Sequence, residues 1–209
     1  NDIPGVFEEK TFKFKLFHAD YDADKLYELD SDTLQPIKTV NSLGAYPYGI
    51  GGGFDGTKLR LFHVDFGIDK LYELDSNTLQ PIKTVNSPGS APSGIGGGFD
   101  GTKLRLFHAD FGIGKLHELD IDTLQPIKTV SSPGAYPFGI GGSFDGTKLR
   151  LFHADYGVDR LYELDINTLQ PIKTVSSPGA SPSGIGGGHY VINKKYIIQN
   201  GIKYELKEV

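Results

Sequence analysis

The chain has 209 residues, with 26 acidic side chains, 21 basic side chains and a formal net charge of −5. This mildly acidic balance offers no basic surface for nucleic acid or an anionic membrane, and no apolar run approaches the roughly 20 residues that cross a bilayer, so we expect neither a nucleic-acid partner nor membrane insertion. The absence of cysteine excludes disulfide bonds and thiolate metal sites but leaves the compartment open.

A repeat of 45 residues organises the sequence. The segment Lys-Leu-Arg-Leu-Phe-His occurs at Lys58–His63, Lys103–His108 and Lys148–His153, with a looser copy at Lys13–His18. The copies at 54–98 and 99–143 differ at ten positions. A fixed period of this size is typical of repeat proteins, whose units bury their apolar faces only against neighbouring units. We therefore expect one domain over residues 1–209.

Each repeat predicts four short strands separated by turn residues. In the copy that begins at Gly94, Asp100-Gly101 is a strong hairpin signal. The next segment alternates apolar and polar side chains, and the last, Pro-Ile-Lys-Thr-Val, combines β-branched residues with a leading proline that suits an edge strand. The four predicted strands of this copy are 94–99, 103–109, 115–120 and 126–130.

Four antiparallel strands in about 45 residues are typical of one blade of a β-propeller. The order Pro-x-Gly-Ile, Phe-Asp-Gly, Leu-Phe-His-Ala-Asp and Leu-Tyr-Glu-Leu-Asp-x-x-Thr resembles the blades of the NHL and YVTN families over nearly the whole chain. The Phe-His pair departs from the aliphatic residues usual at that place in those families. The resemblance implies the propeller fold but no function, because this fold serves many unrelated ones.

The repeat predicts an all-β, five-bladed β-propeller whose last blade is incomplete. The inner strands are rich in glycine, which indicates close backbone approach around an axis. A four-bladed ring with extra terminal strands is the competing count, and the N-terminal strand around Ile3–Phe7 could belong to the first blade or complete the last. The expected blades are 1–43, 44–88, 89–133, 134–178 and 179–209, the last with strands at 184–192, 195–199 and 202–209.

One face of such a ring collects aromatic and acidic side chains. The loops between second and third strands and the connections between blades lie on the same face. Aromatic rings can cover the apolar face of a sugar while carboxylates bind its hydroxyls, although the rings could instead pack between blades. The candidate ligand-binding residues are Asp20, Tyr21, Asp65, Phe66, Asp110, Phe111, Asp155 and Tyr156 in the loops, and Tyr46, Tyr48, Tyr136 and Phe138 in the connections.

The connections alternate along the chain. Tyr46-Pro47-Tyr48 and Tyr136-Pro137-Phe138 alternate with Ala91-Pro92-Ser93 and Ser181-Pro182-Ser183, a pattern that indicates duplication of a two-blade unit. If the aromatic connections bind the ligand, two strong and two weak sites are expected. If the loop aspartates bind it, four sites are expected.

No metal, cofactor or catalytic centre is expected. His18, His63, His108 and His153 recur on the second strand, one layer from the axis, where hydrogen-bonded structural histidines are favoured over a metal ring. The carboxylates of Asp20, Asp22 and Asp24 are not repeated as a set in the other blades, which favours a solvated loop over a calcium site. Inner strands of glycine, isoleucine and phenylalanine offer no acid–base pair at the axis.

These patterns favour a non-enzymatic, multivalent binding protein. Carbohydrate is the favoured ligand by analogy with five-bladed lectins of the tachylectin type, an analogy of blade count and repetition rather than of shared residues. Several weak, equivalent sites would bind a multivalent surface through avidity. The alternatives are a protein–protein interaction scaffold and a recently amplified propeller without a specialised ligand. The oligomeric state is left open.

Overall fold

The computed structural model describes residues 15–185, 196–199 and 202–205. Its regular structure consists of strands, and among these residues no helix is long and apolar enough to cross a membrane. The strands are β1 (Leu16–Asp20), β2 (Lys25–Leu29), β3 (Pro36–Asn41), β4 (Pro47–Phe54), β5 (Leu59–Asp65), β6 (Lys70–Leu74), β7 (Pro81–Asn86), β8 (Pro92–Phe99), β9 (Leu104–Asp110), β10 (Lys115–Leu119), β11 (Pro126–Ser131), β12 (Pro137–Phe144), β13 (Leu149–Asp155), β14 (Arg160–Leu164), β15 (Pro171–Ser176), β16 (Tyr196–Gln199) and β17 (Ile202–Glu205).

The strands form antiparallel sheets that follow the repeat. β4–β7, β8–β11 and β12–β15 make three four-stranded sheets, β1–β3 make a three-stranded sheet, and β16 pairs with β17. The complete sheets share one register, in which the isoleucine of the inner strand faces the histidine of the second strand. The prediction of four strands per repeat is therefore confirmed for these three sheets, whereas the inner strand expected at Ile3–Phe7 lies outside the described residues.

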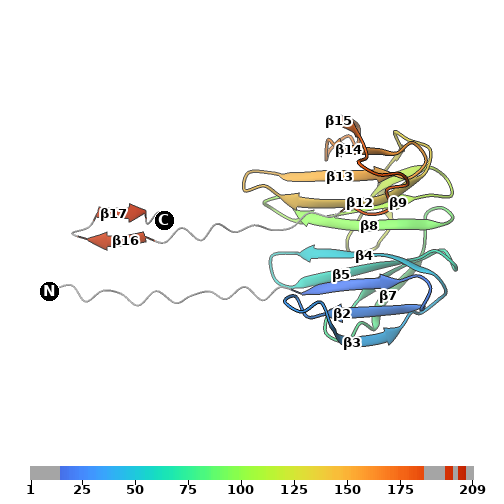
Figure 1. Ribbon diagram of the computed structural model, residues 1–209, viewed down its shortest axis with the longest axis horizontal. Coiled ribbons are helices and arrows are strands. Elements are labelled where there is room, and N and C mark those ends of the chain that lie inside the picture. Colours follow the sequence, from blue (N-terminus) through green and yellow to red (C-terminus); the bar gives the residue numbers. More distant parts are fainter. Residues whose placement is uncertain (1–14, 186–195, 200–201, 206–209) are drawn as a thin grey trace.

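Glycine lets the inner strands pack backbone against backbone. β4, β8 and β12 lie side by side at the centre, with the other strands of each sheet further out (Figure 1). A Cβ atom added at Gly49 would come within 2.9 Å of the Ser93 carbonyl oxygen, and one at Gly51 within 2.6 Å of the Ile95 carbonyl oxygen. Side chains are excluded from this contact, which explains the glycine-rich inner strands.

Apolar side chains fill the spaces between successive sheets. Phe62, Val64 and Leu71 of one sheet pack with Leu106 and Leu124 of the next in a single buried cluster, and equivalent clusters lie on either side. Leu124 belongs to the Asp-x-x-Thr-Leu turn and has a left-handed φ of 59°. Its full burial offsets the strain of that backbone conformation.

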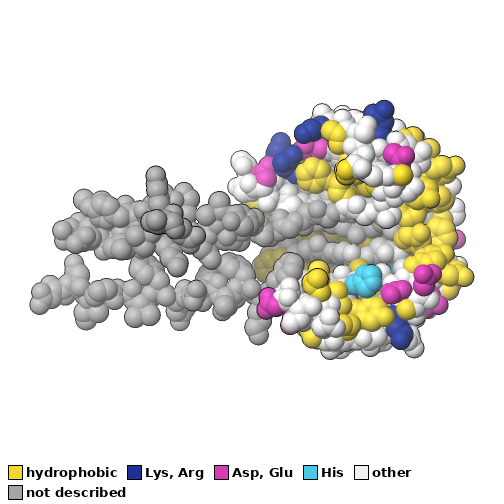
Figure 2. Space-filling model, in the orientation of Figure 1, with side chains coloured by type: hydrophobic (Ala, Val, Ile, Leu, Met, Phe, Trp, Pro, Cys, Tyr) yellow, Lys and Arg dark blue, Asp and Glu magenta, His cyan; other side chains and the backbone are white. Residues whose placement is uncertain are grey.

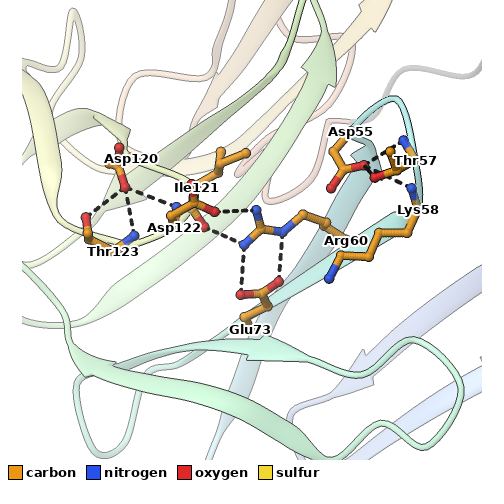
Figure 3. Close-up of polar contacts among 9 residues, drawn as sticks. All are labelled: Asp55, Thr57, Lys58, Arg60, Glu73, Asp120, Ile121, Asp122 and Thr123. Carbon is orange, nitrogen blue, oxygen red and sulfur yellow. Dashed lines mark hydrogen bonds and ion pairs between the residues drawn. The ribbon is translucent and has the colours of Figure 1, made fainter.

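In the β4–β7 and β8–β11 sheets, an arginine reaches the following sheet. Arg60 pairs with Glu73 of its own sheet through two bonds of 2.8 and 2.9 Å, and donates to Asp122 Oδ1 and to the Ile121 carbonyl oxygen, which belong to the next sheet (Figure 3). The same turn is shaped by Asp120, which accepts bonds from Thr123. Arg105 repeats the contact 45 residues later. Bidentate pairing fixes both the side chain and the sheet spacing.

The fifth blade expected over 179–209 is not confirmed. Of its described residues, β16 and β17 form a separate two-stranded sheet, which Figure 1 draws apart from the larger sheets. One face of the first sheet, β1–β3, and one face of the last large sheet, β12–β15, are correspondingly exposed to solvent. Leu34 is 61% exposed, although its equivalents Leu79, Leu124 and Leu169 are buried, and the Arg150 side chain is 39% exposed.

Replacement of Arg60 by methionine should destabilise the protein far more than replacement of Arg160. In Arg60→Met the carboxylate of Glu73 stays buried without its guanidinium, which costs about 3 kcal/mol. Arg160 is exposed at the start of β14, so Arg160→Met should change stability by less than about 0.5 kcal/mol. Urea unfolding of both variants measures the difference, and equal losses would contradict an inter-sheet role for Arg60.

Candidate functional site

The loops and connections lie on one face, as the sequence predicts. The loop after β5 hydrogen-bonds to the connection before β4, where Phe66 N donates to the Tyr46 carbonyl oxygen at 3.1 Å. The same bond recurs from Phe111 N to the Ala91 carbonyl oxygen, at 3.1 Å. Each connection is thus fixed against the loop beside it, and the side chains of both belong to one surface.

Eight aromatic side chains form a continuous cluster on this surface, which we name the aromatic face. Ring contacts with centroid distances of 4.7 to 6.5 Å connect all eight. Hydrophobic side chains gather along the right-hand side of Figure 2, where β4 and β8 begin in Figure 1. The members are Tyr21, Tyr46, Tyr48, Phe66, Phe111, Tyr136, Phe138 and Tyr156. The structure therefore brings together all the aromatic residues that the sequence singles out.

The cluster has a centre that is buried at Phe138 and half-buried at Tyr48, and an exposed rim. Tyr48 and Phe138, from connections two repeats apart, meet edge to face at 5.1 Å and line a central cavity of about 220 Å³. Burial raises the pKa of the Tyr48 hydroxyl. Tyr46, Tyr136 and Tyr156 remain 44–47% exposed. The rim rings are therefore available to a ligand, and the central rings support them.

Stacking alternates from repeat to repeat. The Tyr46 ring stacks on Tyr21 at 4.7 Å, and the equivalent Tyr136 ring stacks on Phe111 at 5.0 Å. In the other repeats Ala91 and Ser181 hold the place of these tyrosines. The duplication read from the sequence thus produces two kinds of local surface.

The loop aspartates do not fit the expected ligand contact. Asp65, Asp110 and Asp155 are 0% exposed. Asp155 Oδ1 accepts the amide N–H groups of Gly157 and Val158, at 3.0 and 3.3 Å. Asp20, which is partly exposed, caps its own loop in the same way. The carboxylates hold the loop in shape, because a buried acceptor must satisfy its hydrogen bonds within the protein.

A second set of aspartates, which the sequence analysis did not select, positions the connections. Asp24 Oδ1 accepts the Tyr46 N–H at 2.8 Å, and Asp69 Oδ1 accepts the Ala91 N–H at 2.7 Å. Both aspartates have a left-handed φ, of 51° and 52°. The sequence signals these aspartates by their spacing, because each lies 22 residues before the residue whose N–H it caps. In the third repeat, Gly114 stands in place of the aspartate.

Three of the four repeated histidines make the hydrogen bonds expected of structural residues, whereas His18 is exposed on β1. His63, His108 and His153 are fully buried. Each Nδ1 lies 2.8–2.9 Å from the carbonyl oxygen of an inner-strand glycine. Burial lowers the pKa of His63 to about 4, so the ring is neutral at physiological pH and Nδ1 is the donor.

The third and fourth repeats place a serine hydroxyl beside the histidine and aspartate. Ser132 Oγ lies 3.3 Å from His153 Nε2 and 3.4 Å from Asp155 Oδ2. Ser87 repeats the arrangement. Both carboxylates of this kind are buried and shape loops, so these contacts belong to the scaffold. Among the described residues, no three metal-ligating side chains converge.

No family model and no curated protein matches the chain. Solved structures do match. The fold is a β-propeller. Hydrazine synthase of Kuenenia stuttgartiensis is similar, with 16% sequence identity over 77% of this chain and 45% of that chain and a TM-score of 0.58. U3-55K is 10% identical over 81% of this chain and 50% of its own, with a TM-score of 0.61. Virginiamycin B lyase of Staphylococcus aureus is 15% identical over 83% of this chain and 57% of its own, with a TM-score of 0.55. The chain spans about half the length of these propeller proteins, and at such identities the likeness establishes the fold alone.

Replacement of His117 by tyrosine should make stability less sensitive to acid. Burial and the neighbouring His108 lower the pKa of His117 to about 4, below the ordinary value near 6.5. The unfolded chain therefore binds the proton first, and the stability lost between pH 6.5 and pH 4 is on the order of 2 kcal/mol. Tyr72 and Tyr162 hold this position in other blades, so His117→Tyr is accommodated.

Urea unfolding from pH 7 to pH 4 of wild type and His117→Tyr measures this effect. The decline should be shallower in the variant but not absent, because His63 remains buried in both proteins. Parallel declines would show that His117 carries its proton in the folded state.

Proposed function

We propose that this propeller is a multivalent carbohydrate-binding protein without enzymatic activity. The observation that supports this most directly is the aromatic face, where four rings are 39–47% exposed. Exposed aromatic rings stack on the apolar C–H face of a sugar, and polar groups beside them bind its hydroxyls. Repetition around the ring multiplies such sites, which raises affinity for a glycan-covered surface through avidity.

The proposal includes a closed ring of five blades, of the NHL or YVTN type that the motif order favours. Gly184 and Ile185 follow β12 as β12 follows β8: a Cβ atom added at Gly139 would come within 2.8 Å of Ile185 N. Lys15 of the first blade and Ile185 also line one cavity of about 340 Å³, which is distinct from the cavity beside Tyr48 and Phe138. A fifth blade over 179–209 would cover Leu34 and Arg150, whose equivalents are covered elsewhere.

Leu34→Ala and Leu124→Ala test the closure. Leu124 is buried between two blades, and its truncation should cost roughly 3 kcal/mol. A fifth blade would bury Leu34 in the same way, so both variants should lose similar stability in urea unfolding. A loss below about 0.5 kcal/mol for Leu34→Ala, the range of an exposed position, would contradict a closed ring.

A glycan array tests the proposed function. Wild type should bind a subset of glycans, and Phe66→Ala/Tyr156→Ala should weaken that binding at least tenfold, because each change removes a ring on which a sugar stacks. The matched control Ile82→Ala/Ile127→Ala removes apolar area from the outer strands and should bind as wild type. No binding by wild type across the array would refute the lectin assignment.

A second candidate is a protein-interaction scaffold that uses the blade edges. Each outer strand presents one isoleucine that is 59–63% exposed, at the same place in every blade. Regular apolar side chains on edge strands favour contact with another polypeptide. The residues are Ile37, Ile82, Ile127 and Ile172. Recovery of a protein partner that Ile82→Ala/Ile127→Ala loses would support this function.

A further inference from the structure

Ala91 carries no ring at the place where Tyr46 adds one to the aromatic face. It is the equivalent of Tyr46, one repeat later. The φ angles are 66° at Tyr46 and 57° at Ala91, and an aspartate 22 residues earlier caps each N–H group. The two backbones therefore agree, and the side chain is the main difference between the two places.

The tyrosine rings show what these places hold. Tyr46 stacks on Tyr21 of the preceding blade, and a Cβ atom added at Gly67, in the same blade as Tyr46, would come within 3.0 Å of Tyr46 Cδ2. The Tyr46 ring thus lies between the Tyr21 ring and Gly67. Tyr136 lies in the same way between Phe111 and Gly157. Each tyrosine ring fits beside its glycine because a side chain at Gly67 or Gly157 would meet the ring.

The residues of both walls are repeated at Ala91 without the tyrosine. Phe66 takes the place of Tyr21, and its ring centroid lies 6.5 Å from that of Phe111. Gly112 takes the place of Gly67, and a Cβ atom added there would come within 2.4 Å of Ser90 Oγ. The rim carries polar groups: Asp69 and Ser90 are exposed, and Asp69 accepts the Ala91 N–H through Oδ1. We name the space bounded by Phe66, Ala91 and Gly112 the Phe66 slot.

We propose that the Phe66 slot binds one pyranose ring of a glycan, an inference that rests on the carbohydrate-binding function proposed above. The sugar's apolar C–H face would cover Phe66, and its hydroxyls would donate to Asp69 and exchange hydrogen bonds with Ser90. A pyranose matches this rim better than an aromatic side chain, because its hydroxyls surround the ring and a tyrosine carries one.

This assignment inverts the ranking of sites that the connections suggest. Tyr46 and Tyr136 occupy their slots themselves, so the strong site lies in a blade with a small connection residue. Ser181 has the same left-handed φ, 56°, and its N–H is capped by Asp159. Among the described residues, it leaves the Tyr156 ring without a stacked tyrosine.

Ala91→Tyr tests the slot, because it should fill the space as Tyr46 does. The native φ at Tyr46 shows that tyrosine is accommodated on this backbone. The probes are methyl α-D-mannoside, methyl β-D-galactoside and methyl N-acetyl-β-D-glucosaminide, followed by saturation-transfer NMR and titration. Binding of the preferred probe should weaken about tenfold, with loss of one site. Ile127→Tyr, which adds a tyrosine on an outer strand, should bind as wild type.

Tyr46→Ala gives the opposite expectation. It should open a slot between Tyr21 and Gly67 and add one site per chain. If glycans bind wild type and Ala91→Tyr equally, the slot assignment is wrong and the lectin function stands. If no glycoside or array glycan binds wild type, both fail. If p-cresol, the tyrosine side-chain analogue, binds at the slot and the glycosides do not, the slot receives an aromatic side chain instead.

Discussion

Contact between successive blades is the constraint on which the rest of this molecule depends. A single four-stranded blade has two apolar faces, and neither can be buried within the blade itself. The turn leucine and the second-strand arginine solve this together: Leu124 fills the space between two blades, and Arg60 joins its own Glu73 to the turn beside Leu124. Because a turn follows the third strand of every blade, one contact repeated along the chain sets the blade spacing.

That spacing brings the inner strands so close together that only glycine fits at several positions. The start of each inner strand then lies near the axis, and the connection before it meets the loop of the preceding blade and the loop of its own blade. Tyr48 and Phe138 consequently touch although 90 residues separate them. The aromatic face is thus produced by the arrangement of the blades around the axis and not by any one blade.

The polar groups beneath that face are used by the scaffold. Buried histidines hold the inner strands, and buried aspartates hold the loops. What remains at the surface is a set of rings with exposed carboxylates such as Asp69 at their edges. Such a surface suits recognition by stacking and hydrogen bonding more than acid–base chemistry, for which mobile protons and accessible catalytic groups are required. Under the proposed function, alternation of tyrosine with alanine or serine would decide where a ligand ring enters.

The sequence by itself determined the repeat, the strands, the turns, the structural role of the histidines and the face on which aromatic residues gather, because these follow from local periodicity and turn chemistry. Whether an aspartate such as Asp65 is exposed or buried was decided only by the tertiary structure. So was the stacking of Tyr46 on Tyr21, a contact that the equivalent Ala91 has no ring to make. Burial and stacking depend on groups from neighbouring blades, and a pattern within one repeat carries no information about the distance between blades.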